Sequence, residues 1–211
     1  KKLPKPLVDI NNKPFIYYLL KQLESFNFKE VIILAGYKSE KFENFQLKYL
    51  KDLNIKLVII NQPVNWETAK RISKIRNKLD NKFCLLYGDN LVNIRSNYFN
   101  GKANKVLIQS KRLALEEGNI SINEKIINYY NERRHKKLNY VELGYFILNK
   151  KNILENLNSK NISFSKIIYK LLKQKKLKYQ ITKSKYLSIT DSLRLKKTKK
   201  NIKKYFWKFC K

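Results

Sequence analysis

The fold is decided by the run Val31-Ile32-Ile33-Leu34-Ala35, an unbroken apolar stretch that Gly36 ends. Such a run, bounded by a turn residue, is typical of a strand buried on both faces of a parallel sheet. A segment of helical periodicity over residues 15–26 precedes it, and a second buried run, Phe83-Cys84-Leu85-Leu86-Tyr87, is stopped by Gly88-Asp89-Asn90. This spacing predicts βαβ units, in which a ligand binds at the carboxyl ends of the strands.

The same patterns predict the remaining elements. We expect helices over residues 15–26, 39–50, 67–79 and 162–172 and from residue 192 onward, and strands over 31–35, 55–60, 83–87, 106–108, 120–130, 140–148 and 177–181. The fold class is therefore α/β, with a Rossmann-like, mostly parallel sheet flanked by helices and a mixed α+β C-terminal half. No linker or repeat interrupts the chain, which predicts one domain over residues 1–195 and a basic C-terminal helix or tail over 196–211.

The charge is the most extreme property of the composition. The 211 residues include 47 Lys and Arg against 16 Asp and Glu, a net charge of +31 and a pI near 10.0. Such a chain attracts polyanions such as nucleic acid or an anionic membrane. The lysines are nevertheless spread along a sequence rich in Lys, Asn, Ile and Tyr, so a compositional bias is the alternative explanation.

Several classes of protein are excluded by residue counts. No apolar run approaches the length of about 20 residues that spans a bilayer. Cys84 and Cys210 are too few for a disulfide framework or a four-ligand zinc site, and His135 is the only histidine. The start of the chain does not have the pattern of a signal peptide, so we expect a cytoplasmic protein.

Three short motifs, taken in order, carry chemistry. They are Leu3-Pro4-Lys5-Pro6-Leu7-Val8-Asp9-Ile10-Asn11-Asn12-Lys13-Pro14-Phe15, then Leu86-Tyr87-Gly88-Asp89-Asn90, then Ile189-Thr190-Asp191-Ser192-Leu193-Arg194. Their order and spacing resemble the sugar-1-phosphate nucleotidyltransferase family across nearly the whole chain, and the nearest types are the heptose-1-phosphate guanylyltransferases and the glucose-1-phosphate cytidylyltransferases. The resemblance implies that the partners are an NTP and a sugar 1-phosphate and that the products are an NDP-sugar and pyrophosphate.

The resemblance implies a role for one residue in each motif. Lys5, which lies between two prolines that restrict the backbone, would present its ammonium to a phosphate. Asp89 would be a catalytic residue and bind Mg²⁺, a cation that is held by one or two carboxylates together with substrate phosphates. Asp191 would supply the second metal carboxylate. The structural alternatives are an exposed turn lysine, an ordinary turn aspartate and an N-cap of the last helix, for which Thr190 and Ser192 compete.

Substrate-binding positions follow from the same resemblance. Glu132 and Arg133 match an acid that contacts the sugar and a cation that contacts its phosphate. Gly144 matches a position of close approach to the sugar, and Gly88 of the Gly-Asp motif is also expected to bind substrate. The alternative for Glu132-Arg133 is a solvated basic turn, and for Gly144 a bulge within a strand.

Two departures from the family pattern stand out. The family's first strand and its glycine-rich phosphate loop should lie just before Lys1, and the sequence has no Met, so we expect a missing N-terminal piece without which the enzyme is not competent. The loop that reads the base is expected at Asn65-Trp66-Glu67-Thr68-Ala69-Lys70-Arg71, where bulkier residues replace glycines.

Three hypotheses on function follow. The first is an enzyme of this family, and the second is a non-catalytic relative of it. The third is a basic module that binds nucleic acid or an anionic membrane through the Lys- and aromatic-rich stretch 196–211, although we expect no specific nucleic acid. The structural alternative for that stretch is a helix that docks Ile202, Tyr205, Phe206 and Phe209 on the domain while its lysines face water. The sequence is also compatible with assembly into a homo-oligomer.

Overall fold

The computed structural model describes residues 3–157 and 161–206 and divides the chain into two compact units. The first unit consists of residues 1–65, 88–96 and 184–211, and the second of residues 66–87 and 97–183. The predicted boundary at residue 195 stays a prediction, although helix α7 runs through it without a break. No helix in the described residues is long and apolar enough to cross a membrane.

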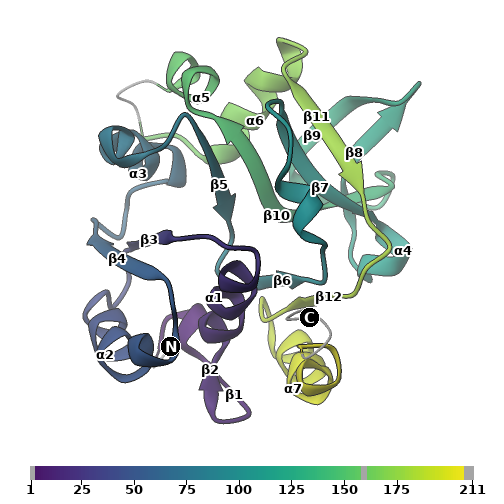
Figure 1. Cartoon of the computed structure of the whole chain (residues 1–211). Helices are drawn as coiled ribbons and strands as arrows, with labels where there is room; N and C mark the ends of the chain where they lie inside the picture. Colours follow the sequence, from purple (N-terminus) through teal and green to yellow (C-terminus); the bar gives the residue numbers. More distant parts are fainter. Residues whose placement is uncertain (1–2, 158–160, 207–211) are drawn as a thin grey trace. The chain divides into compact units, whose positions relative to one another are not determined.

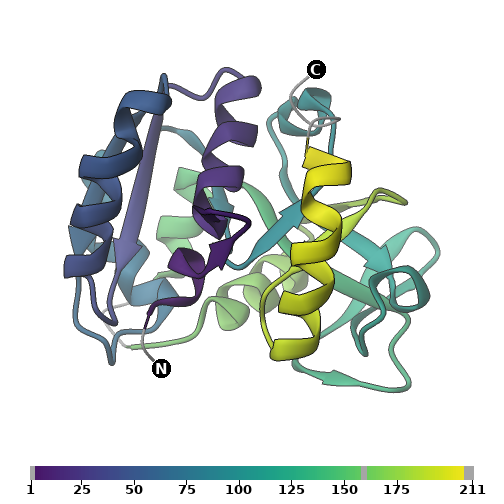
Figure 2. The same ribbon diagram turned by 90° about the horizontal axis from the view of Figure 1, so that it is seen from below.

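The described residues of the first unit form eleven elements. They are η1 (Lys5–Leu7), β1 (Asp9–Ile10), β2 (Lys13–Pro14), α1 (Phe15–Ser25), β3 (Glu30–Ala35), α2 (Glu40–Tyr49), η2 (Leu50–Asp52), β4 (Lys56–Asn61), β6 (Asn90–Val92), β12 (Tyr186–Ser188) and α7 (Ser192–Phe206). The predicted parallel pairing is confirmed for β3 and β4, which run in register from Glu30 beside Lys56 to Ala35 beside Asn61. Helices α1 and α2 run alongside this pair (Figure 2). Helix α1 buries Leu19, Leu20 and Leu23 at the spacing expected of an amphipathic helix.

The second unit is built on one large mixed sheet. Its elements are α3 (Thr68–Lys74), η3 (Arg76–Lys78), β5 (Lys82–Leu86), η4 (Ser96–Phe99), β7 (Asn104–Ser110), α4 (Lys111–Ala114), β8 (Gly118–Asn123), β9 (Ile126–His135), β10 (Tyr140–Asn149), α5 (Lys150–Asn156), α6 (Phe164–Lys173) and β11 (Leu177–Ile181). The strand order is β11-β7-β10-β8-β9, and β5 also pairs with β10 (Figure 1). Strand β10 is central and buried from Val141 to Leu148, which explains its nearly unbroken apolar sequence.

Two expectations on strands need correction. Strand β5 pairs antiparallel with β10, whereas the sequence predicted parallel neighbours. The strand expected over residues 120–130 is the hairpin β8–β9, in which the two residues between the strands, Glu124 and Lys125, have φ angles of 47° and 61°. Positive φ at both turn residues fits a tight hairpin, and neither residue is the Asn or Gly that normally indicates one.

Candidate active site

Lys5 and Asp89 meet in the first unit. Lys5 begins the short helix η1, which is closed by hydrogen bonds of 3.0 Å from the Leu7 amide to the Pro4 carbonyl and from the Val8 amide to the Lys5 carbonyl. The Lys5 Nζ atom lies 3.7 Å from Asp89 Oδ2, and the two side chains are 37% and 25% exposed. Two residues that the sequence assigned to phosphate and metal therefore form one polar, solvent-accessible pair.

Gly88 permits this approach. A Cβ atom at Gly88 would lie only 3.0 Å from Cγ of Pro6, which is closer than side chains normally pack. The absence of a side chain lets the Pro-Lys-Pro segment lie against the turn that carries Asp89. The contribution of Gly88 that the structure describes is thus the close approach of the Pro6 ring to the turn that carries Asp89.

The turn of Asp191 comes to the same place through strand pairing. Strands β6 and β12 are antiparallel, with Asn90 opposite Ser188. One step beyond this pair, the Ile189 amide donates to the Asp89 carbonyl at 3.1 Å. Because Asp191 follows Ile189 by two residues, the Gly-Asp turn and the Asp191 turn lie at one end of this two-stranded ladder.

Asp191 caps helix α7. Its Oδ1 atom accepts the Arg194 amide at 2.8 Å, and its Oδ2 atom lies 3.3 Å from Arg194 Nε. The N-cap interpretation is therefore confirmed for Asp191 rather than for its neighbours Thr190 and Ser192. The side chain is 55% exposed, and a carboxylate has further lone pairs, so capping leaves room for a metal ligand.

The carboxylates of this unit suit Mg²⁺ in number and kind. The described residues contain no cluster of three or more His, Cys, Asp or Glu side chains that would form a closed metal site. Mg²⁺ does not require one, because it keeps several waters and takes one or two carboxylates plus substrate phosphates. The partly exposed Asp89 and the exposed Asp191, on turns at one end of the β6–β12 ladder, are carboxylates of the kind and number that Mg²⁺ takes.

Gly144 lies at a bulge of the central strand of the second unit. Between Glu142 and Phe146, three residues of β10 oppose the single residue Leu107 of β7, and Gly144 has a φ of 75°. This φ lies in the left-handed region, where a side chain would strain the backbone. The bulge interpretation of Gly144 is confirmed, and a contact with substrate at this position stays a prediction.

Glu142 is a residue of this bulge that sequence reasoning missed. Its side chain is buried, with 6% exposure, and its Oε1 atom accepts the Gly144 amide. Its own amide donates to Asn119 Oδ1 at 2.9 Å. The signal in the sequence was a single charged residue within an otherwise apolar strand, two positions before a glycine.

The other two predicted substrate-binding residues lie in β9 of the second unit. Arg133 is exposed there, which agrees with both a phosphate-binding and a solvated cation. The side chain of Glu132 lies outside the described residues. The role of this pair stays a prediction.

The expected base-reading loop is partly helical. Helix α3 begins at Thr68, Ala69 is fully buried in it, and Arg71 Nε donates to the Trp66 carbonyl at 2.8 Å. The Nζ atom of Lys70 lies 4.8 Å from the centre of the Trp66 ring, a cation–π contact. Of the two residues that replace glycines here, Lys70 thus packs on its own segment and Ala69 is buried.

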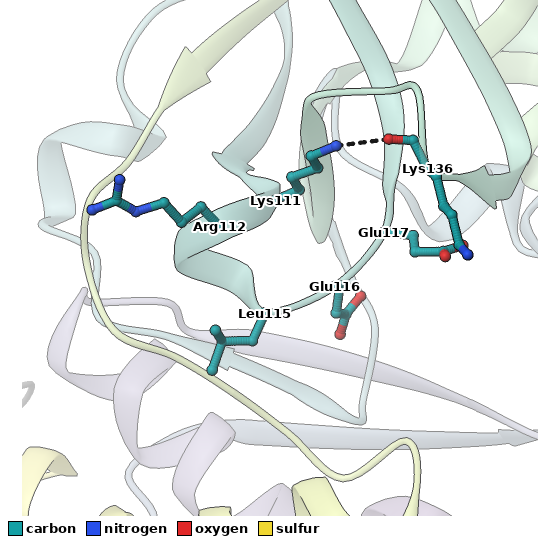
Figure 3. Close-up of a pocket in the computed structure, with 6 residues that line it drawn as sticks. All are labelled: Lys111, Arg112, Leu115, Glu116, Glu117 and Lys136. Carbon is teal, nitrogen blue, oxygen red and sulfur yellow. Dashed lines mark hydrogen bonds between the residues drawn. The ribbon is translucent and has the colours of Figure 1, made fainter.

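A pocket of about 630 Å³ lies in the second unit (Figure 3). Its lining mixes both signs of charge and consists of Lys111, Arg112, Leu115, Glu116, Glu117 and Lys136. Within it, Lys111 Nζ donates to the Lys136 carbonyl at 2.7 Å. None of the predicted site residues lines this pocket.

Comparisons with known proteins place these motifs in a family. The nucleotidyl transferase family model matches residues 1–208. A probable glucose-1-phosphate cytidylyltransferase of Bacillus subtilis is 25% identical over 173 residues, which cover 71% of this chain and 68% of that one. The D-glycero-alpha-D-manno-heptose 1-phosphate guanylyltransferase of Campylobacter jejuni is 25% identical over 179 residues, with 82% and 80% covered.

Solved structures agree on the fold. HddC from Yersinia pseudotuberculosis superposes with a TM-score of 0.81 at 22% identity, covering 96% of this chain and 91% of that one. The same protein complexed with GMP-PN gives a TM-score of 0.80. These likenesses confirm the expected α/β fold of the nucleotide-diphospho-sugar transferase type. Together with the family match over residues 1–208, they establish that the chain belongs to the nucleotidyl transferase family.

Proposed function

We propose that this protein transfers a nucleotidyl group from an NTP to a sugar 1-phosphate and releases pyrophosphate. The observation that carries the proposal is the pairing of Lys5 with Asp89 at the end of the β6–β12 ladder, next to the turn of Asp191. Two phosphorylated anions must approach each other in this reaction, and such a site offers cations and metal-binding carboxylates for them. A location in the cytoplasm stays a prediction.

In this reaction a phosphate oxygen of the sugar 1-phosphate attacks the α-phosphorus in line. The bond between the α-phosphorus and its bridging oxygen breaks, and the electron pair leaves with pyrophosphate. Lys5 would hold the triphosphate, and Arg133 would bind the sugar phosphate, so that attacking and leaving oxygens are oriented. When bound by Asp89 and Asp191, Mg²⁺ supplies positive charge that neutralises the phosphate oxygens.

The substrates that we propose are GTP with a manno-heptose 1-phosphate or CTP with a hexose 1-phosphate. The support is the pair of relatives matched over most of the chain, which are named for those two reactions. The sequence constrains the nucleotide base less than the sugar, because the segment from Trp66 to Arg71 has Ala69 and Lys70 where the family has glycines.

The test is pyrophosphate release by the full-length protein as its gene encodes it, measured across a panel of NTPs and sugar 1-phosphates. We expect turnover with one pair and dependence on Mg²⁺. No release with any pair, while an NTP still binds, would establish the non-catalytic alternative instead.

Substitutions of Asp191 separate its role as the N-cap of α7 from its proposed role as a metal ligand. Asp191→Asn keeps an N-cap of similar strength but removes the negative charge. We expect an unchanged melting temperature and a loss of activity of at least the roughly 10- to 100-fold that perturbing a metal site's supporting groups costs. Asp191→Ala should lose the same activity and about 1 kcal/mol of stability as well. Full activity of Asp191→Asn would leave Asp191 as a cap alone.

Glu142 is expected to act through Gly144. Glu142→Ala removes the acceptor of the Gly144 amide, so a buried N–H loses its partner and the bulge loses its support. We expect the KM for the sugar 1-phosphate to rise about tenfold with little change in the KM for the NTP. Glu142→Gln, which keeps an acceptor oxygen, should restore most of the affinity. An equal rise in both KM values would show a general loss of structure.

A further inference from the structure

Helix α7 presents a continuous row of cations. Its buried side is marked by Thr198 and Ile202, which are 1% and 0% exposed. Six lysines on it are exposed, namely Lys196, Lys197, Lys199, Lys200, Lys203 and Lys204. At about 100° per residue, these six cover one arc of roughly 160° opposite the buried pair. The sequence from Ser192 to Phe206 contains no acidic residue.

The apolar side of α7 is already used within the first unit. The Thr198 hydroxyl donates to the Ser188 carbonyl at 2.8 Å, and Asn11 Nδ2 donates to the Lys199 carbonyl at 3.0 Å. The expected docking of this helix is thereby confirmed at Ile202, whereas Tyr205, Phe206 and Phe209 have side chains outside the described residues. Because the side of Thr198 and Ile202 is buried, the exposed lysines are the part of α7, drawn in yellow in Figure 2, that a charged partner can reach.

Five of the six lysines on this face have no acidic partner in the described part of the chain. No acidic side chain there pairs with Lys196, Lys197, Lys199, Lys200 or Lys203, and Asp191 is engaged by Arg194. Clustered like charges raise the local potential and attract an extended anion. The uniform use of Lys on this face matters, because an ammonium is a point charge without the planar fork of Arg that reads phosphate and base geometry.

We propose that the lysine face of α7 docks the protein on the surface of an anionic lipid bilayer. A straight, convex helix side with point charges matches a broad charged plane, which requires no fixed geometry of its headgroups. The sequence continues from Tyr205 with Phe206, Trp207, Lys208 and Phe209, and aromatic residues next to a basic cluster are typical of the membrane–water interface. This inference is independent of the proposed catalytic function.

The experiment is co-sedimentation of the full chain with phosphatidylcholine vesicles that contain or do not contain phosphatidylglycerol. We expect binding only to the anionic vesicles and release at high salt, because exposed charges are screened. The variant K196Q/K197Q/K200Q/K203Q should bind at least about tenfold more weakly. Gln is a good helix former, so the helix is expected to persist.

A matched control carries the same change in net charge elsewhere. The variant K29Q/K51Q/K78Q/K102Q replaces four exposed lysines outside α7 and should bind vesicles like the unsubstituted protein. If both variants lose the same amount of vesicle binding, the charge dispersed over the whole protein is responsible and the proposal is wrong. The proposal would also be wrong if the protein binds a single-stranded RNA oligonucleotide through α7 and does not bind anionic vesicles. Equal melting temperatures and equal pyrophosphate release in both variants would show that the difference does not arise from unfolding.

Discussion

Asp89→Ala is expected to lower pyrophosphate release by about 100- to 1,000-fold, the range seen when one preorganised electrostatic group of an active site is removed. Asp89 lies 3.7 Å from the Lys5 ammonium and beside the Asp191 turn. Its removal takes away the proposed first metal carboxylate and leaves Lys5 without its counter-ion. The measurement is kcat/KM for the full-length protein at saturating Mg²⁺, together with the Mg²⁺ concentration for half-maximal rate.

The controls for Asp89 distinguish charge from shape. Asp89→Asn has nearly the same volume and should lose nearly as much activity, because a neutral amide is a poor ligand for Mg²⁺. Asp80→Ala removes an exposed carboxylate that lies in the second unit and should leave the rate unchanged. If Asp89→Ala retains full activity, Asp89 is an ordinary turn residue and the metal assignment fails.

Phe146→Ala is expected to cost about 3–5 kcal/mol of the free energy of unfolding, because it leaves a large cavity in a well-packed interior. Phe146 is fully buried on β10, where it lies opposite Leu85 of β5 and Val106 of β7. Its ring centre is 5.3 Å from that of Phe164 in an edge-on arrangement and 5.8 Å from that of Tyr87. At about 2–4 °C per kcal/mol, the melting temperature should fall by roughly 10 °C.

Two matched variants test the cause of that loss. Phe146→Leu keeps an apolar side chain in the site and should cost less than Phe146→Ala. Ile126→Ala removes a side chain that is 63% exposed in the same unit and should change stability by no more than about 0.5 kcal/mol. A loss for Phe146→Ala no larger than that for Ile126→Ala would show that the β5–β10–β7 region is not a cooperative core.

The local elements were well predicted where the apolar pattern is strong. The apolar runs are the strands β3, β5 and β10, of which β10 is buried and the other two are mostly half-buried. The period of 3.6 residues in 162–172 corresponds to α6, with Ile167, Ile168 and Leu171 buried. Strand β5 is half-buried from Phe83 to Leu86. Its pairing was not predictable, because a short apolar run is the same whether the neighbouring strands are parallel or antiparallel. The β8–β9 hairpin was missed because its turn residues, Glu124 and Lys125, are not those that normally indicate a tight turn.

In the candidate site, too, some features were predictable from the sequence and others were not. By itself, the sequence determined which residue types occur and in what order: Lys5 between prolines, a Gly-Asp turn after a buried strand, and Asp191 before a basic helix. Only the tertiary structure decided that Lys5 lies against Asp89 and that the Asp191 turn lies next to the Gly-Asp turn. The reason is that short-range patterns specify helices, strands and turns through local burial and backbone preference. Contacts between residues far apart in the chain depend instead on strand pairing such as that of β6 with β12, which no local pattern encodes.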